Sequence, residues 1–474
     1  MNIFVLDNFN LITDSCLFKS FFMKISYKNA ISPRKVLLSP GKQSEYDRRN
    51  FLKIMASGLL GSVTIGTGSS AVSAWTGINT NSVLNQARTD ARELRIKSVK
   101  PYIMRLQRGV NGELSGTHFV FARVETEDGL VGWGDGSSWP NVVTIASEIE
   151  MIGPRLVGRS AFDTEGIYNF IQGVRSPSHG ASVQSCISAI DIALWDIIGQ
   201  KLNVPVYQLL GGKVNPRIKI YTSYRWGKIE PTREAYAQRT KELIAEGALA
   251  GKWDPFIGGL EPNRNLGMEL FNRVVQMVQG VREGGPNFEI CVEGHGKFNV
   301  HGAIRMAKAL EPYNVLFFEE PVMPENADAL REVQRSTSTP LAVGERLKGR
   351  LEAREYIEKQ AMRIIQPDAV RCGGITEFRK MVYMAESQFM TFSPHNPNSP
   401  VGTAAHLHLA TSSASFLILE EGIQQPDAYK AIFQQWDGGL AYWQVPEKPG
   451  LGVHITDEFL REHSIPIDKA ERTT

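Results

Sequence analysis

The sequence predicts an α/β protein whose larger part is a (β/α) barrel and whose first part is a smaller α+β domain. The chain has 474 residues, enough for a barrel of ordinary size with an additional domain. Between residues 288 and 421, six short apolar runs end in a carboxylate or an imidazole, at intervals of 26, 26, 23, 27 and 25 residues. Each interval suits one strand, one helix and two short loops. The six end residues are Glu293, Glu319, Glu345, Asp368, His395 and Glu420.

Charge and cysteine content narrow the class of protein. The chain has 52 Lys and Arg against 50 Asp and Glu, so nothing indicates a nucleic-acid or anionic-membrane partner, and a small-molecule substrate is expected. The cysteines, Cys16, Cys186, Cys291 and Cys372, form no Cys-x-x-Cys pair. They are therefore expected to be buried apolar residues rather than a disulfide framework or a zinc site.

The N-terminal part carries an export-like segment. Residues 1–45 give no fold prediction, and residues 46–75 resemble a twin-arginine signal, with Arg48-Arg49 before a Gly/Ser/Ala-rich stretch. This pattern predicts export to the periplasm; the alternative is a chance basic pair on a surface helix, which would leave the protein cytoplasmic. No other stretch is expected to be apolar over the length of a spanning helix, so the mature protein is predicted to lack a membrane span.

Residues 92–215 predict the α+β domain. Alternating apolar residues from Thr117 to Val124 lead to Asp128-Gly129, a tight-turn signal between antiparallel strands. Apolar residues then recur at helical spacing from Ala181 to Leu202, before Leu209-Leu210-Gly211-Gly212 ends the unit.

Residues 216–440 predict the barrel. From Arg217 the chain alternates between strand and helix patterns, which indicates parallel strands with right-handed crossovers. Catalytic residues of such barrels lie at the C-terminal ends of several strands, so the polar residues that close the apolar runs predict an active site. Residues 441–474, with Pro449-Gly450-Leu451-Gly452, are expected to leave the barrel and return to the first domain.

Several motifs resemble one known superfamily. Asp128–Gly134 and Ala189–Asp196 are similar to the capping domain of the enolase superfamily. The barrel motifs that resemble its mandelate racemase-like branch are Glu319-Glu320-Pro321, Gly344-Glu345-Arg346 and Gln366-Pro367-Asp368 followed by Gly373-Gly374-Ile375-Thr376. Val292–Lys297 and Pro394–Pro397 look most like galactonate dehydratases. The resemblance implies a modified (β/α)7β barrel under an N-terminal capping domain, substrate between the two, and a homo-oligomer.

The resemblance also implies a magnesium ion held by Glu293, Glu319 and Glu345. Three carboxylates on successive strand ends are hard oxygen ligands, whereas any one of them alone would more often be a helix N-terminal charge or a surface ion pair. Alternation directs Glu320 to the opposite face from Glu319. Glu293 departs from the usual aspartate, and its extra methylene moves the carboxylate by roughly 1.5 Å, which a flexible site absorbs but a tight octahedral site resists.

The proton carriers follow from the same motifs. The family pairs Asp368 with His395, whose imidazole is the general base; the alternative is a loop histidine that caps backbone groups. His295 follows Glu293 by two residues, so strand alternation predicts that both face the same side. The resemblance makes His295 the general acid for the leaving 3-hydroxyl, and the alternative is a hydrogen-bond donor to a metal ligand.

Three further residues are assigned by position. Lys252 and Asp254 lie where related racemases carry Lys-x-Lys, so the second base is replaced and two-base racemisation is disfavoured. Lys252 either neutralises the substrate carboxylate or forms a salt bridge. Glu420 matches a glutamate expected to donate to the enediolate if its pKa is raised, with Glu421 as the competing choice. Arg346 either contacts substrate hydroxyls or pairs with a neighbouring acid.

Together these features predict magnesium-dependent dehydration of a sugar acid, an aldonate such as galactonate, to a 2-keto-3-deoxy acid. The proton next to the carboxylate becomes acidic once a divalent metal stabilises the enediolate. Two alternatives stay open: an epimerase, racemase or cycloisomerase of a related acid, and an exported acid-sugar binding protein without turnover. Specificity is expected from the capping-domain loops Arg108–Gly116 and Gly134–Asn141.

Overall fold

The computed structural model describes residues 94–470, except 109–113, 139–140, 176–179, 224, 257–263, 423–425, 435 and 437. The described residues lie in one compact unit, residues 78–474. The export-like segment 46–75, Cys16 and residues 109–113 of the first predicted specificity loop fall outside the described residues.

A four-stranded antiparallel sheet forms the base of the capping domain. Its order is β13 (Ser464–Ile465), β1 (Ile96–Arg108), β2 (Leu114–Thr126), β3 (Val131–Asp135). Gly129 has φ +89° in the turn between β2 and β3, and its N–H donates to the Thr126 carbonyl at 3.0 Å. Glycine adopts this left-handed conformation without a Cβ clash, which is why the Asp-Gly signal marks the turn.

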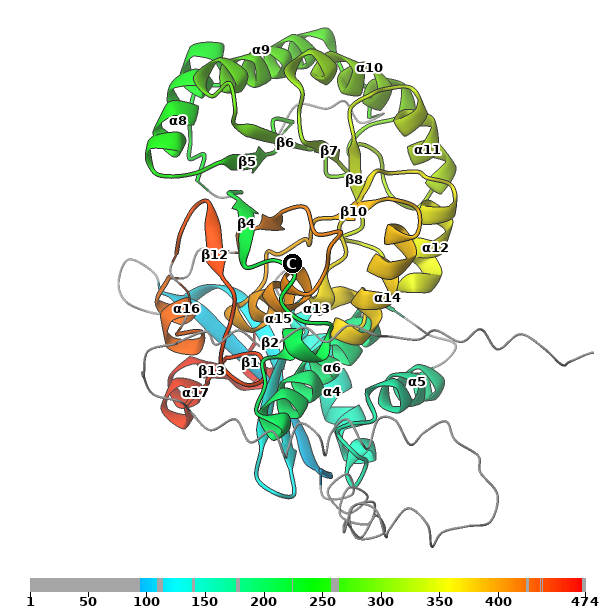
Figure 1. Ribbon diagram of the computed structural model, residues 1–474, viewed down its shortest axis with the longest axis vertical. Coiled ribbons are helices and arrows are strands. Elements are labelled where there is room, and N and C mark those ends of the chain that lie inside the picture. Colours follow the sequence, from blue (N-terminus) through cyan, green and yellow to red (C-terminus); the bar gives the residue numbers. More distant parts are fainter. Residues whose placement is uncertain are drawn as a thin grey trace, which may run out of the picture. The chain divides into compact units, whose positions relative to one another are not determined.

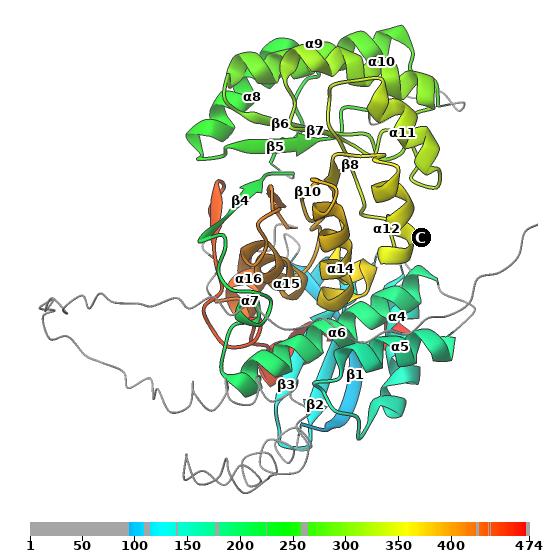
Figure 2. The same ribbon diagram turned by 45° about the vertical axis from the view of Figure 1, so that its right-hand side comes forward.

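Helices α4 (Val142–Ile152), α5 (Thr164–Arg175) and α6 (Ala181–Leu202) cover this sheet (Figure 2). The approach of α6 to β3 is set by two glycines. A Cβ on Gly134 would lie 1.9 Å from the Ala189 carbonyl oxygen, and one on Gly132 would lie 2.2 Å from that of Ala193. Only glycine fits there, so the Gly-x-Gly pair of the strand and the small residues of α6 form one packing unit.

The expectation that no other stretch has the length and apolarity of a membrane span is wrong for α6. Ala181–Leu202 meets both criteria, but 83% of its apolar window is buried inside the protein. It is the central helix of the capping-domain core. Like a spanning helix, a buried core helix is apolar on all sides because every side faces apolar surroundings.

Within the described residues, the barrel has eight parallel strands in chain order. They are β4 (Arg217–Tyr221), β5 (Ala250–Trp253), β6 (Glu289–Glu293), β7 (Phe317–Glu319), β8 (Leu341–Val343), β9 (Ile364–Ile365), β10 (Thr391–Phe392) and β11 (Leu419–Glu420). Strands β5 to β10 form one sheet, and β4 pairs with β11. Bridges from Thr222 to Gly251 and from Phe392 to Phe416 close the ring. The predicted barrel is confirmed.

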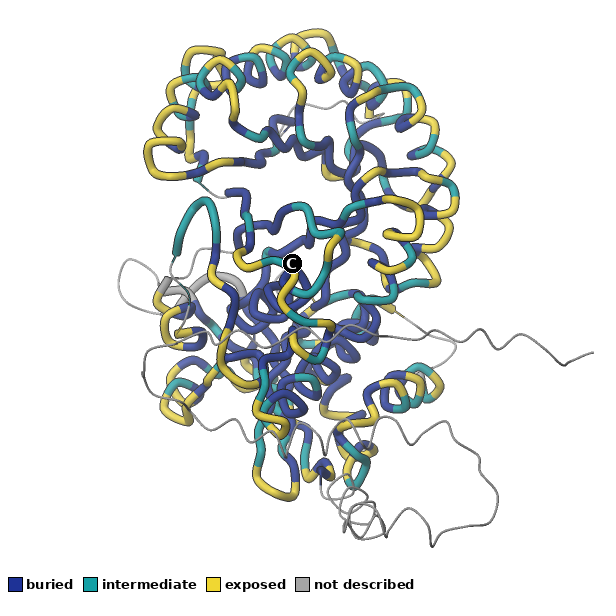
Figure 3. Tube along the Cα trace, in the orientation of Figure 1, coloured by how far each residue is buried: buried dark blue, intermediate teal, exposed yellow. Residues whose placement is uncertain are grey.

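Helices surround these strands (Figure 1). They are α8 (Arg233–Ala245), α9 (Met268–Gly284), α10 (Val300–Leu310), α11 (Ala327–Arg335), α12 (Arg350–Glu358), α13 (Ala369–Cys372), α14 (Gly374–Glu386), α15 (Pro400–Thr411) and α16 (Pro426–Ile432). Side chains of Thr232, Asn299, Asn326 and Ser399 accept backbone N–H groups at helix starts, which fixes where each helix begins after its strand. Burial is concentrated on the strands and the inward faces of the helices (Figure 3).

The C-terminal segment links the two parts. Strand β12 (Tyr442–Gln444) runs antiparallel to β4, α17 (Asp457–His463) follows, and β13 then pairs with β1 of the capping sheet. Cys186, Cys291 and Cys372 are buried, as predicted.

Candidate active site

The strand-end residues gather at one end of the barrel. Glu293 and Glu319 are the last residues of β6 and β7 and lie directly opposite each other in the strand register. Glu345 follows β8, and Glu420 ends β11. All four are buried, because parallel strands place their carboxyl ends on the same side of the barrel.

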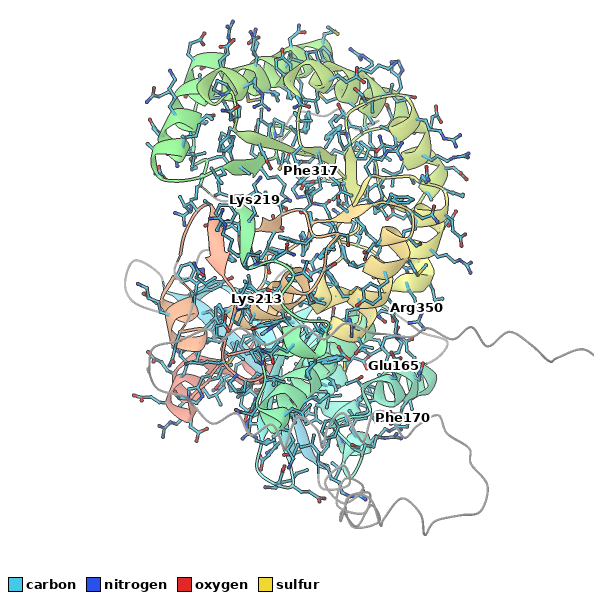
Figure 4. The ribbon with its side chains drawn as sticks, viewed as in Figure 1. Glu165, Phe170, Lys213, Lys219, Phe317 and Arg350 are labelled. Carbon is cyan, nitrogen blue, oxygen red and sulfur yellow. The ribbon has the colours of Figure 1, made fainter. Side chains whose placement is uncertain are left out.

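Apolar side chains fill the barrel below these carboxylates. The rings of Tyr221 and Phe317 meet edge to face at 5.8 Å, and Phe317 lies in the middle of the barrel (Figure 4). Cys291, Ala342, Ile364 and Ile418 belong to the same buried cluster. The carboxylates therefore lie against a buried apolar layer, where an unpaired charge is costly in free energy.

Lys252 on β5 is the cation at the centre of the cluster. Its Nζ lies 2.8 Å from Glu319 Oε2, 3.0 Å from Glu293 Oε2 and 3.2 Å from Glu420 Oε1. Burial disfavours its charge, but the carboxylates, Glu319 foremost, outweigh that cost and raise the pKa of Lys252 well above its usual value. Here Lys252 forms the salt bridges that were the second of its two predicted roles.

One lysine does not balance the negative charge around it. Burial raises the pKa of Glu293 to about 7, with Glu345 adding to the rise. Burial, followed by the Glu293 charge, raises the pKa of Glu319 well above its ordinary value. Gln366 Nε2 donates to Glu319 Oε2 at 2.9 Å. Apart from its ion pair with Lys252, Glu293 Oε2 has no hydrogen-bond partner among the described residues. This surplus of carboxylate oxygens fits a hard divalent cation.

No preformed ion cage exists among the described residues. No group of three His, Cys, Asp or Glu side chains in that part of the chain is arranged around one point as a bound ion requires. The Lys252 ammonium instead lies against both Glu293 and Glu319. An ion at this site would have to compete with Lys252 for these two carboxylates.

Glu320, the residue after Glu319, has a different partner. Its φ is +34°, and its Oε2 accepts from Arg346 Nε at 2.7 Å. Burial raises the pKa of Glu320 to about 8. Glu320 lies beyond the last residue of β7 in a left-handed conformation, so strand alternation does not explain its direction. Its partner is Arg346, which therefore pairs with a neighbouring acid.

Asp368 and His395 form a buried pair. Asp368 caps the start of α13, and His395 follows β10 by three residues. His395 Nδ1 lies 2.9 Å from Asp368 Oδ2, and its Nε2 lies 3.1 Å from Glu345 Oε2. Although burial opposes ionisation, the hydrogen bond from His395 and the nearby charges hold the pKa of Asp368 at about 2. Asp368 is therefore an ionised acceptor that orients the imidazole.

The reasoning that placed His295 by strand alternation is wrong, although the residue does lie beside Glu293. Strand β6 ends at Glu293, and His295 has φ +47°, a left-handed conformation in which alternation no longer applies. The His295 N–H donates to Glu293 Oε1 at 2.8 Å, and Nδ1 lies 2.7 Å from Asp254 Oδ2. The side chain is 46% exposed, so it is accessible to a bound molecule.

Asp254 is a site residue whose partner was not predicted. Besides His295 it accepts from Lys297 and from the Phe256 N–H. The contacts with His295 and Lys297 cross from the end of β5 to the loop after β6. The available signal was the pairing of adjacent parallel strands, which brings residues just beyond β5 and β6 together.

Glu420 does not have the raised pKa that proton donation would need. Burial opposes its charge, yet Lys252 and then His395 outweigh burial and lower the pKa of Glu420. Its oxygens accept from the Asn396 N–H at 2.9 Å and from Ser223 Oγ at 2.8 Å. The competing residue, Glu421, accepts from Arg225 Nε at 2.9 Å.

A cleft of about 470 Å³ reaches Glu345 between the capping domain and the barrel. Ser138, Ala181 and Ser185 line it from the capping domain, and Arg346, Lys348 and Arg371 line it from the barrel. Ser138 belongs to the predicted specificity loop Gly134–Asn141. The cleft has the size of a small-molecule site.

The sequence matches two domain families. Residues 93–211 match the mandelate racemase/muconate lactonizing enzyme N-terminal domain, and residues 235–459 match the enolase C-terminal domain-like family. D-gluconate dehydratase of Thermoproteus tenax is 30% identical over 78% of this chain and 74% of its own length. D-xylonate dehydratase of Haloferax volcanii is 33% identical over 73% of this chain and 85% of its own length.

The fold agrees with these matches. A solved structure of an enolase superfamily member from Salmonella Typhimurium has a TM-score of 0.71 and 28% identity, covering 78% of this chain and 98% of that one. The domain matches, the relatives and the shared fold cover both the capping domain and the barrel. The chain therefore belongs to the mandelate racemase/muconate lactonizing enzyme family of the enolase superfamily, among its sugar-acid dehydratases.

Proposed function

We propose that this protein removes water from a sugar acid, an aldonate such as galactonate, to give a 2-keto-3-deoxy acid with the help of Mg²⁺. The observation that carries the proposal is a pair of histidines, each held by an aspartate. His395 contacts Asp368 at 2.9 Å, and His295 contacts Asp254 at 2.7 Å. They follow β10 and β6, which are four strands apart in the eight-stranded ring and so on opposite sides of it.

Each of the two histidines carries out a different proton transfer. With its Nδ1 donating to Asp368, His395 takes the C2 proton of the substrate on Nε2, and the bonding electrons move into the carboxylate to form an enediolate. His295 then gives a proton to the 3-hydroxyl as the C3–O bond breaks, and water leaves. The enol product gains a proton at C3 and loses one from its oxygen, and each histidine exchanges one proton with solvent to return to its starting state.

Glu293, Glu319 and Glu345 are the residues that would hold the magnesium ion. When bound, the ion supplies Lewis-acid stabilisation of the enediolate charge. Three carboxylates attract a dication more strongly than a monovalent ammonium, which favours displacement of Lys252 from Glu293 and Glu319. Glu420, ionised and held by Asn396 and Ser223, keeps an anionic partner next to Lys252.

The direct test is a substrate panel. Purified protein is incubated with aldonates and aldarates, with Mg²⁺ or with a chelator, and 2-keto-3-deoxy products are measured. Product from at least one acid, lost with chelator and restored by Mg²⁺, is expected. His395→Asn should abolish turnover. No product from any acid counts against the proposal, and binding without turnover that is unaffected by His395→Asn indicates a binding protein instead.

Epimerisation is a second candidate, because the His295–Asp254 pair supplies an acid/base group on the side where the second lysine is absent. In D₂O, deuterium incorporated at C2 of an acid that keeps all its hydroxyls would indicate an epimerase. A product that has lost the 3-hydroxyl indicates the dehydratase.

A further inference from the structure

His406 lies in α15 next to the pair formed by Asp368 and His395, and is fully buried. Its Nε2 lies 3.6 Å from Asp368 Oδ1. Its Nε2 accepts the Ala369 N–H at 2.9 Å, and its Nδ1 lies 3.0 Å from Asn396 Oδ1. Because Nε2 accepts, the proton of the neutral ring is on Nδ1, which donates to Asn396. Burial agrees with the neutral form, since it lowers the pKa of His406 to about 4.

The two partners of His406 adjoin the two residues of the proton-abstracting pair. Ala369 directly follows Asp368, and Asn396 directly follows His395. Asn396 is itself fixed, because its N–H donates to Glu420 Oε2 at 2.9 Å and its Nδ2 donates to the Glu420 carbonyl at 3.0 Å. The rigid ring of His406 therefore connects the chain next to the base with the chain next to its orienting carboxylate.

We propose that His406 is a positioning residue that sets the separation between His395 and Asp368. The inference rests on the proposed function, in which His395 abstracts the C2 proton. Proton transfer depends steeply on the placement of the base, so a displacement of less than a bond length slows this step without affecting substrate binding to the same degree.

A histidine buried for packing alone is the alternative, and the same helix supplies a matched control. His408 lies two residues further along α15 and is equally buried. Its Nδ1 accepts the Tyr207 N–H at 3.1 Å, and its ring stacks on Tyr207 with centroids 5.8 Å apart. The two histidines share helix and burial, but only His406 adjoins the pair.

The test compares kcat, KM, C2 proton exchange in D₂O and thermal stability for His406→Leu and His408→Leu. Both variants should lose stability. Only His406→Leu should lower kcat and C2 exchange, by about 100-fold, with little change in KM. His406→Asn keeps a donor toward Asn396 and His406→Gln keeps an acceptor toward Ala369, so each should have a higher kcat than His406→Leu. If His406→Leu does not fold, these two variants replace it in the comparison.

Crystal structures of the variants give a readout that does not require activity. The distance from His395 Nδ1 to Asp368 Oδ2, 2.9 Å in the wild type, should lengthen in the His406 variants and stay the same in His408→Leu. Equal losses of kcat in both leucine variants, or an unchanged distance in the His406 variants, overturns the inference. If the wild type turns over no acid, the proposed function fails, and the distance still decides the role of His406.

Discussion

Glu293 is the carboxylate whose charge should matter most for metal binding. It is buried, and its Oε2 lies 3.0 Å from Lys252 Nζ. Glu293→Gln keeps the shape but removes a charged ligand, so Mg²⁺ affinity measured by calorimetric titration should fall at least about tenfold.

Two variants serve as comparisons for Glu293→Gln. Glu421 is a buried glutamate that pairs with Arg225. Glu421→Gln is therefore the matched control, and it should keep the wild-type affinity for Mg²⁺. Glu293→Asp retains the charge and should still bind the ion. An unchanged affinity in Glu293→Gln would remove Glu293 from the ligand set.

Substitution of Asp254 should slow only the loss of water, which follows removal of the C2 proton in the proposed reaction. Asp254→Asn weakens the hold on His295 Nδ1 and removes the ion pair with Lys297. Water loss is expected to slow by about 10- to 100-fold, while C2 proton exchange by His395 persists. Product formation and isotope exchange are measured on the same samples, and equal losses in both would place Asp254 outside the acid step.

At the residue scale, local patterns predicted positions better than partners. The six strand-end residues were found because strand ends recur at a regular interval. The contacts of Lys252 with three carboxylates, and of Asp254 with His295, join segments 40 or more residues apart. Sequence spacing does not report such contacts. The left-handed conformation of His295 was missed as well, since that conformation is uncommon for a residue other than glycine.

At the element scale, the interface between α6 and α14 carries a buried aspartate. Asp191 accepts from the Thr376 N–H at 3.0 Å and from Thr376 Oγ1 at 2.5 Å. Burial raises the pKa of Asp191 from 3.8 to about 7. Between these two values the folded protein binds a proton that the unfolded chain does not, so stability from this residue is present at low pH and is lost as pH rises toward 7.

Asp191→Asn should therefore change the pH dependence of folding. Asparagine cannot ionise, so the variant should lose less stability than the wild type between pH 5 and 8, by up to about 3 kcal/mol, because about two of the pKa units of the shift fall in this window. Urea unfolding at both pH values measures the difference. Asp427→Asn, at an exposed position on α16, should leave the wild-type slope unchanged. A wild-type slope in Asp191→Asn would show that Asp191 is ionised throughout.

Elements were predictable where their pattern is long. Helix α6 has the bounds that helical spacing gave, Ala181–Leu202. Strands β9, β10 and β11 are two residues each, too short for any periodicity, and only the regular interval between their ends indicated them. The approach of α6 to Gly132 and Gly134 depends on atoms of both elements and was not predictable from either one.

At the scale of the whole molecule, the order of the domains followed from composition and repeated patterns, whereas their joint surface did not. The cleft at Glu345 is lined from both sides, by Ser138 and Ser185 of the capping domain and by Arg346 and Arg371 of the barrel. Its lining depends on how two separately predicted units pack. The class of substrate is thus easier to predict than the hydroxyl stereochemistry it accepts.

Export is the last whole-molecule prediction. Arg48-Arg49 precedes a small-residue stretch that ends near Ala74, a pattern typical of a route that carries folded proteins. Such a route would allow the metal to enter the site before export. In a bacterial host, the wild type should be found in the periplasm and shortened by the signal segment. Arg48→Lys with Arg49→Lys should leave full-length protein in the cytoplasm, whereas Arg34→Lys should have no effect. Fractionation and mass spectrometry measure location and length, and full-length wild type in the cytoplasm would show that Arg48-Arg49 is a chance pair.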